Sequence, residues 1–210
     1  MEEIIKEIKD LVRQDYKEIV LLGQNVNSYQ ISNSQFLISK QIPKSQISDK
    51  SDFVRLLEEL NNIPGDFKIK FLTPHPKDMN DELIEAMATL PKISHELHLP
   101  VQSGDDEILK KMNRGYTAKQ YLDLIKKIRN KIPDIKLSTD IIVGFPGETK
   151  EQFENTVELC KKVKFDKAYI AQYSPRPGTA AFKMLDDVSK AEKKHRWQIL
   201  EDLLNPRTKF

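Results

Sequence analysis

The alternation of strand-like and helix-like segments is the feature that most constrains the fold of this chain. Short apolar runs of strand length recur five times, and amphipathic segments of helical period lie between them. Strands are expected at 17–22, 67–72, 94–101, 135–143 and 167–172. Strands that are joined by helices pair in parallel through right-handed crossovers. The pattern therefore predicts an α/β fold with parallel strands and outer helices, either a β/α barrel, complete or open, or a doubly wound sheet.

The helical segments between these strands carry side chains that mark where they begin. We expect helices at 1–15, 52–61, from residue 80, 105–112, 117–130, 150–163 and 190–204. The last three helices begin with a capping box, in which a hydroxyl accepts from the third amide and a Glu or Gln side chain returns the hydrogen bond. The pairs are Thr117 with Gln120, Thr149 with Gln152, and Ser189 with Glu192.

The domain organisation follows from composition and from the order of the elements. We expect one domain over residues 1–204 and a short tail at 205–210. Residues 28–51 are rich in Ser, Gln, Asn and Lys and contain Pro43, which predicts a polar, solvated insertion. Because the chain opens with a helix, we expect a first strand to be missing before it, which would make the barrel partial.

Charge and cysteine count limit the chemistry that the 210 residues can perform. Lys and Arg number 34 against 32 Asp and Glu, so a formal net charge of +2 points to neither nucleic acid nor a membrane. No apolar run approaches the roughly 20 residues of a membrane span, so we expect a cytoplasmic protein without a membrane partner. The single cysteine, Cys160, excludes an internal disulfide, an all-cysteine zinc site and a self-contained iron–sulfur cluster. Its place on the apolar side of a helix predicts a core residue.

Polar and glycine-rich segments follow each predicted strand, where ligands gather in parallel β/α folds. These segments are 23–27, 73–76, 102–104, 144–148 and 173–179. Strand alternation also places polar side chains opposite the apolar face, with His98 on the third strand and Asp140 on the fourth. Several polar inward positions favour an open barrel that holds a polar ligand. Glycine and proline also punctuate ordinary turns, and a lone inward histidine is often a hydrogen-bonded core residue.

Two further groups of charged residues have alternative interpretations. Arg176 lies between two prolines, where it could present a cation to an anionic ligand or form a surface ion pair. The basic cluster at 190–196 could contact RNA phosphates, but its interleaved acids favour a solvated helical surface.

Five segments, taken in order, resemble one family. They are LLGQNVNSY (21–29), FLTPHPKDM (71–79), HLPVQSGDDEILKKMNRGYT (98–117), STDIIVGFPGET (138–149) and YSPRPGT (173–179). They are similar to the radical S-adenosylmethionine (SAM) methylthiotransferases, and to the MiaB-type tRNA methylthiotransferases among them. The likeness runs from residue 1 to 204. It implies a partial, open β/α barrel of the radical SAM type.

The resemblance also implies a reaction and its cofactors. The family binds SAM and a 4Fe-4S cluster on a CxxxCxxC motif, and reductive cleavage of SAM gives a 5'-deoxyadenosyl radical. A second cluster supplies sulfur. The product is a methylthio group on isopentenyl-adenosine beside the tRNA anticodon. Partners are then tRNA and an electron donor such as flavodoxin or ferredoxin. This chain lacks the cluster cysteines, so we expect the cluster ligands to lie outside it and the isolated chain to be inactive.

The motif positions imply which residues contact the cofactor. Gln24 and Asn25 match the second barrel strand near the methionine end of SAM, and Gln102 and Ser103 match the tip of the fourth. Asp140, Ile142 and Gly144 match the fifth, near ribose and adenine. There the family pattern GxIxGxxE is altered, because Asp140 replaces the first glycine and the acid, Glu148, falls one place late. His75 and Arg176 are expected substrate contacts, and no residue is assigned to a metal.

Other functions remain open from the sequence. The substrate could instead be threonylcarbamoyl-adenosine in tRNA or a ribosomal protein, as in related enzymes. The chain could also be a relic or accessory module that kept the barrel without its chemistry. An unrelated barrel enzyme for a phosphorylated metabolite would need a phosphate cup and an acid–base pair, and the segment at 144–148 does not supply both.

Overall fold

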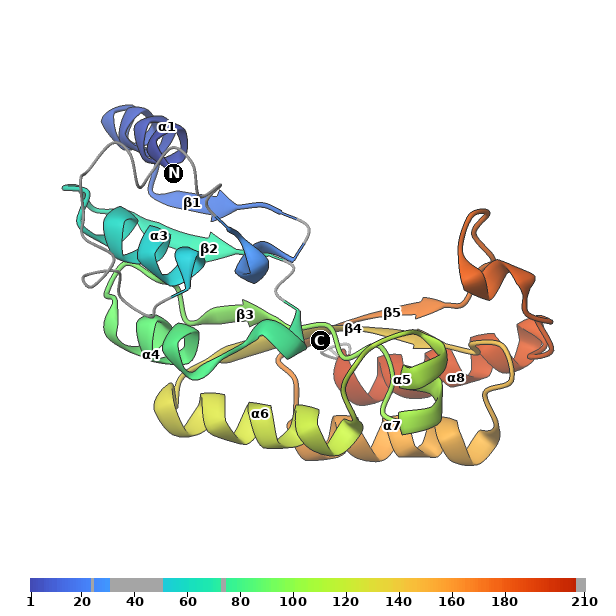
Figure 1. Ribbon diagram of the computed structural model, residues 1–210. Coiled ribbons are helices and arrows are strands. Elements are labelled where there is room, and N and C mark those ends of the chain that lie inside the picture. Colours follow the sequence, from blue (N-terminus) through green and yellow to red (C-terminus); the bar gives the residue numbers. More distant parts are fainter. Residues whose placement is uncertain (24, 31–50, 73–74, 207–210) are drawn as a thin grey trace. The chain divides into compact units, whose positions relative to one another are not determined.

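The computed structural model describes residues 1–23, 25–30, 51–72 and 75–206 (Figure 1). The chain divides into two compact units, Met1–Leu97 and His98–Phe210, and each is described by itself. Most of the insertion predicted at 28–51 lies outside the described residues, as do Gln24 and residues 207–210 of the predicted tail.

The first unit is built around two parallel strands. Its elements are α1 (Glu2–Arg13), β1 (Glu18–Leu21), the 3-10 turn η1 (Val26–Ser28), α3 (Asp52–Asn61), β2 (Lys68–Phe71), the 3-10 turn η3 (Pro76–Asp78) and α4 (Asp81–Thr89). Ile19 of β1 lies opposite Ile69 of β2, and an isolated bridge joins Ile69 to Ile93. These three isoleucines are buried, together with the apolar faces of α3 and α4. The predicted helices and strands of this unit are confirmed within a few residues.

The second unit carries most of a three-stranded sheet in the order β3-β4-β5. Its elements, with β3 crossing the boundary between the units, are β3 (Glu96–His98), α5 (Asp106–Lys111), α6 (Ala118–Lys131), β4 (Lys136–Val143), α7 (Lys150–Val163), β5 (Lys167–Gln172), the 3-10 turn η4 (Ala180–Lys183) and α8 (Lys190–Leu204). β4 and β5 pair in parallel from Ser138 opposite Lys167 to Val143 opposite Gln172. Figure 1 shows α6, α7 and α8 together on one side of β4 and β5.

The third strand is shorter than the predicted 94–101. Pro100 has no amide hydrogen to donate, which interrupts the ladder. Just before the proline, the amide of Leu99 donates to the Ser138 carbonyl (2.8 Å), and pairing resumes beyond it, where the amide of Gln102 donates to the Asp140 carbonyl (2.9 Å). The segment after β3 therefore follows β4 as far as Gln102.

The predicted strand faces are confirmed in this sheet. Burial alternates along β4, where Leu137, Ile141 and Val143 are buried and Ser138, Asp140 and Ile142 are half-buried. Leu97, Leu99 and Val101 are likewise buried. The polar alternates thus lie on the face of β4 opposite its buried apolar residues.

Two of the three predicted capping boxes form completely, at Thr117 and Thr149. At α8 only half of the box forms. Ser189 accepts from the amide of Glu192, but the Glu192 carboxylate accepts from Arg196 Nε (2.8 Å). The prediction of a full box was wrong there because a buried guanidinium is a stronger partner than a backbone amide. Within the described part of the chain, none of the helices combines the length and apolarity that a membrane crossing requires.

Candidate functional site

In the first unit, the loops that follow β1 and β2 are tied together by one asparagine. The Asn27 side chain donates to the carbonyl of His75 (3.1 Å) and accepts from the amide of His75 (3.0 Å). Ser28 adds a hydrogen bond to Asp78 (2.7 Å), and His75 Nδ1 accepts from the amide of Lys77. The structure therefore brings Asn25 and His75, two predicted site residues, onto adjoining loops. Sequence reasoning did not identify Asn27 as the residue that joins these loops.

In the second unit, a polar cluster lies on the sheet face opposite the helices. The His98 imidazole bridges two side chains of β4, with Nδ1 at 3.0 Å from Ser138 Oγ and Nε2 at 3.3 Å from Asp140 Oδ2. The Tyr169 ring on β5 meets the imidazole edge to face at 5.8 Å. The Asp140 side chain keeps 41% of its surface exposed, against 16% for His98. The Asp140 carboxylate is thus held by His98 and remains accessible to a ligand.

The segment after β3 holds the next two predicted residues in different environments. Gln102 is buried, and within the described residues its side chain makes no hydrogen bond. Ser103 is fully buried, with Oγ at 3.3 Å from Thr156 Oγ1 on α7. The next residue must be a glycine, because a Cβ on Gly104 would lie 2.5 Å from the Thr156 Cα. The described contacts of Ser103 therefore serve the docking of this loop on α7.

Backbone strain singles out two of the predicted residues. Five non-glycine residues have positive φ, and three of them, Asp15, Asn113 and Lys164, end helices, where a left-handed residue is common. The other two are Asn25 (φ 54°) and Gln102 (φ 68°), which follow strands. Asparagine adopts this region more readily than most residues, whereas glutamine does so only where its surroundings enforce it, and residues held in this way cluster at functional sites. Both were predicted cofactor contacts.

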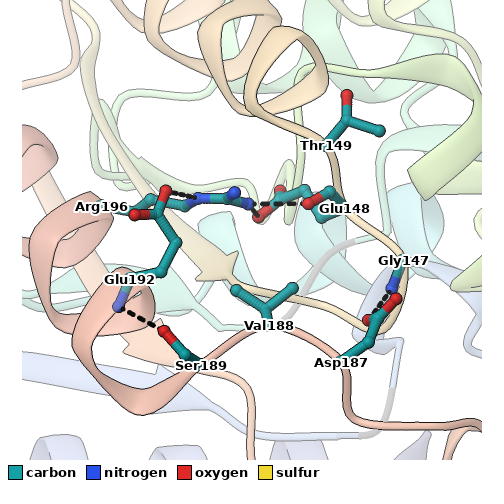
Figure 2. Close-up of a pocket in the computed structure, with 8 residues that line it drawn as sticks. All are labelled: Gly147, Glu148, Thr149, Asp187, Val188, Ser189, Glu192 and Arg196. Atoms are coloured by element: carbon teal, nitrogen blue, oxygen red, sulfur yellow. Dashed lines mark hydrogen bonds and ion pairs between the residues drawn. The ribbon is translucent and has the colours of Figure 1, made fainter.

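The loop after β4 is fixed by a buried ion pair (Figure 2). Glu148 Oε2 accepts from the Gly144 amide (2.7 Å) and from Arg196 Nη1 (2.8 Å), and Nη1 also donates to the Glu148 carbonyl (3.0 Å). The two side chains are 1% and 6% exposed. Burial raises the pKa of Glu148, and the Gly144 amide and Arg196 offset only part of that rise. Burial lowers the pKa of Arg196, but Glu192 and Glu148 outweigh it and the pKa is raised.

This arrangement gives Gly144 a structural role that the sequence did not indicate. Its amide is used by Glu148, and at φ 69° a Cβ would lie 2.3 Å from Lys193 Cγ. The prediction of a solvated surface at 190–196 was wrong for Lys193 and Arg196, which are both buried, whereas Lys190, Lys194 and His195 are exposed. Their spacing with Leu200 and Leu204 is helical and could have signalled burial.

A cavity of about 440 Å³ opens beside the ion pair, lined by Gly147, Glu148, Thr149, Ser189, Glu192 and Arg196 among others. Figure 2 shows the Arg196 guanidinium between the two glutamates, with the Gly147 amide turned to Asp187. Because every charged group drawn there already has a partner, the cavity does not present a free charge to a ligand. Arg176, the other predicted substrate contact, is exposed on the loop after β5.

The donor set of the chain does not fit an iron–sulfur cluster. Among the described residues, no group of three His, Cys, Asp or Glu side chains could hold a metal ion. Cys160 is fully buried in α7, and burial raises the pKa of its thiol to about 12. This confirms its predicted place in the core.

Comparison with known families assigns the chain to a family. A family model described as the radical SAM superfamily matches residues 1–160. The chain belongs to the radical SAM superfamily. This confirms the family part of the resemblance found in the sequence.

Several curated relatives of this radical SAM chain are named tRNA-2-methylthio-N(6)-dimethylallyladenosine synthase. That of Thermoanaerobacter sp. (strain X514) is 50% identical over 204 residues, which are 97% of this chain and 40% of the relative. Those of Acetivibrio thermocellus and Fusobacterium nucleatum are 48% and 45% identical over 205 residues, with 98% of this chain and 40% and 44% of the relatives covered. The chain thus spans about two fifths of the length of these relatives.

Two solved structures confirm the fold class. Coproporphyrinogen III oxidase (HemN) from Escherichia coli aligns with a TM-score of 0.63 at 18% identity, covering 97% of this chain and 44% of that one. SuiB from Streptococcus suis, bound to its precursor peptide, aligns at 0.55 with 16% identity, covering 97% and 40%. The predicted α/β fold, a partial β/α barrel with parallel strands and outer helices, is confirmed.

Proposed function

We propose that this chain forms most of the radical SAM barrel of a tRNA methylthiotransferase. Such an enzyme adds a methylthio group to isopentenyl-adenosine beside the anticodon. The observation that carries the proposal is the 50% identity over 97% of the chain to enzymes named for that product. Structural likeness does not carry it, because the aligned solved structures are less than 20% identical and support the fold alone. Proteins with this activity act on tRNA in the cytoplasm, and we propose both for this chain.

The residues on the open face of the second unit fit SAM. The Asp140 side chain is 41% exposed and its carboxylate is held by His98, so it can accept hydrogen bonds from the two ribose hydroxyls without reorienting. Ile142 lies two residues further along the same face of β4 and offers an apolar surface to the adenine. Gln102, with a strained backbone and a side chain without a described hydrogen bond, supplies an amide for a polar group of the cofactor. When bound, SAM supplies the reactive and methyl-donating groups.

The first unit contributes Asn25 to the same proposal. Its left-handed backbone lies in the loop after β1, and Asn27 joins that loop to the loop of His75. We assign Asn25, with its neighbour Gln24, to the amino-acid end of SAM, and His75 and Arg176 to the nucleic acid. Because no three cysteines occur in the chain, we assign the 4Fe-4S ligands to sequence outside it, and we propose an electron donor such as flavodoxin or ferredoxin as a further partner.

The test is a chimera that supplies what this chain lacks. Residues 1–204 replace the matching 204 residues of the Thermoanaerobacter relative, and the gene is expressed in bacteria that lack the endogenous enzyme. Mass spectrometry of tRNA nucleosides should detect 2-methylthio-N(6)-isopentenyl-adenosine. The matched control is Asp140→Asn in the same chimera, which keeps the shape and removes the charge. A soluble chimera that leaves isopentenyl-adenosine unmodified, or that thiolates threonylcarbamoyl-adenosine instead, would refute the proposal.

A further inference from the structure

The segment that joins β5 to α8, residues 174–188, exposes an apolar surface that the second unit does not cover. We call this segment the arm. Leu185 is 81% exposed, Phe182 49% and Met184 37%. Large apolar side chains gathered on one exposed segment mark a surface that binds a partner. Figure 1 shows the arm, in orange to red, projecting beyond the carboxyl end of β5.

Hydrogen bonds within the arm, and one from Tyr173 just before it, hold the arm in one conformation. Tyr173 Oη donates to the carbonyl of Ala181 (2.9 Å), and Thr179 Oγ1 donates to the carbonyl of Arg176 (2.8 Å). The amide of Phe182 donates to the carbonyl of Thr179 (3.2 Å), which places Phe182 in the 3-10 turn η4. Pro175 and Pro177 further restrict the backbone. A surface that is already ordered loses less conformational entropy when it binds.

The acidic and basic residues of the arm differ in whether they have partners. Each of its two acids has a partner, although both residues are exposed: Asp186 accepts from the buried Lys193 ammonium (2.5 Å), and Asp187 accepts from the amide of Gly147 (2.7 Å). Its cations Arg176 and Lys183 are exposed, and neither makes an ion pair with any described residue. The arm therefore carries an exposed aromatic ring and two exposed cations without an ion-pair partner among the described residues.

From this combination we infer that the arm binds single-stranded RNA, with a base stacked on Phe182 and phosphates at Arg176 and Lys183. Single-stranded RNA is recognised by base stacking on aromatic side chains and by cations on its phosphates. A protein partner would be favoured by the apolar residues alone, but both acids already have partners whereas Arg176 and Lys183 form no ion pair with a described residue, and such cations match a phosphate backbone. The inference rests on the proposed function, and it assigns the arm as the surface that holds the unpaired nucleotides of the tRNA.

Binding of a labelled RNA hairpin tests the inference on the 210-residue chain itself. The probe is a 17-nucleotide anticodon stem-loop, and fluorescence anisotropy gives its affinity between 50 and 200 mM salt. Phe182→Ala should weaken binding by about tenfold, the loss of one stacked base. The double variant Arg176→Gln/Lys183→Gln should also lower the slope of log affinity against log salt by about 1.4, or roughly 0.7 for each phosphate contact.

Matched controls separate the arm from general effects. Lys126→Gln/Lys162→Gln removes the same charge from exposed positions on α6 and α7 and should keep the parent slope within about 0.3. Tyr16→Ala removes an exposed aromatic ring from the first unit and should not change the affinity. Fluorescence of the single tryptophan, Trp197, confirms that each variant is folded.

Three results would overturn the inference: no hairpin binding by the parent chain, arm variants that bind like their controls, or arm variants that lose solubility or stability at unchanged affinity. The last would mean that the arm packs against protein. The chimera distinguishes this failure from failure of the proposed function. If it makes the methylthio nucleoside while arm variants keep full RNA affinity, the arm inference alone is wrong.

Discussion

Replacing Arg196 with methionine should destabilise the second unit by about 3 to 5 kcal/mol at pH 7. The change leaves the Glu148 carboxylate, whose side chain is 1% exposed, without its only cationic partner among the described residues. Removing one partner of a buried ion pair costs that much because an uncompensated charge stays in a low-dielectric interior. The guanidinium also donates to the Glu148 carbonyl and to Glu192, so loss of these bonds adds to the effect. Methionine keeps most of the side-chain volume.

Urea unfolding followed by the fluorescence of Trp197 measures this effect in the right part of the molecule. This tryptophan lies on α8 next to Arg196, and its indole donates to the carbonyl of Ile170 on β5 (3.0 Å). Lys194→Met, an exposed position on the same helix, is the control and should change the free energy of unfolding by less than about 0.5 kcal/mol. The double variant Arg196→Met/Glu148→Gln should recover at least about 2 kcal/mol, since both charges are then gone.

The pH dependence gives a second check with a definite sign. Burial raises the pKa of Glu148 in the folded chain, and loss of Arg196 should raise it further. A carboxyl whose pKa is higher folded than unfolded binds more protons in the folded state, so stability increases as pH falls through the folded pKa. The penalty of Arg196→Met should therefore shrink between pH 7 and pH 5. A penalty equal to that of Lys194→Met, or one that grows on acidification, would refute the buried-pair argument.

Three further outcomes follow from the same structure. Gly104→Ala should lower stability by about 1 to 3 kcal/mol in urea unfolding, because the new Cβ would lie 2.5 Å from the backbone of Thr156. Native Cys160, with burial raising its pKa to about 12, should resist Ellman's reagent at pH 8 and react fully only in urea; fast native labelling would contradict its burial. In the chimera, His98→Gln should weaken SAM binding about tenfold in equilibrium dialysis by freeing the Asp140 carboxylate, and an unchanged affinity would show that His98 does not position it.

The elements themselves were predictable because their signals are local. β5 at 167–172, α7 at 150–163 and α8 at 190–204 have the predicted bounds, since periodicity, capping residues and flanking turns all agree there. β3 shows the limit of this reasoning. Its apolar alternation extends to residue 101, but a proline without an amide hydrogen and the left-handed turn at Gln102 end the regular strand early. The alternation of apolar and polar side chains indicates which residues are buried, but it does not indicate which backbone amides can form hydrogen bonds.

The sequence predicted on which strands and loops the candidate site residues lie, but it predicted few of the contacts that these residues make. Strand alternation correctly placed His98, Ser138 and Asp140 on one face, because the period of a strand is fixed at two. The role of Asn27 was missed, since two hydrogen bonds across 48 residues leave no trace in local spacing. In the sequence, Glu148 was noted only as an acid one position late in the family pattern. In the structure, its carboxylate accepts from the Gly144 amide and fixes the loop after β4.

Helix α8 explains why these long-range contacts matter for the site. Lys193 bonds Asp186 of the arm and the carbonyl of Tyr173 (3.2 Å), while Arg196 bonds Glu148 in the loop after β4. Two successive turns of one helix thus hold the loops that leave β4 and β5. Charged residues are rarely buried unless each meets a partner, so their burial here requires both loops to be in place. The basic cluster that resembles a solvated surface in the sequence therefore has two buried members, Lys193 and Arg196, which hold the arm and the loop after β4.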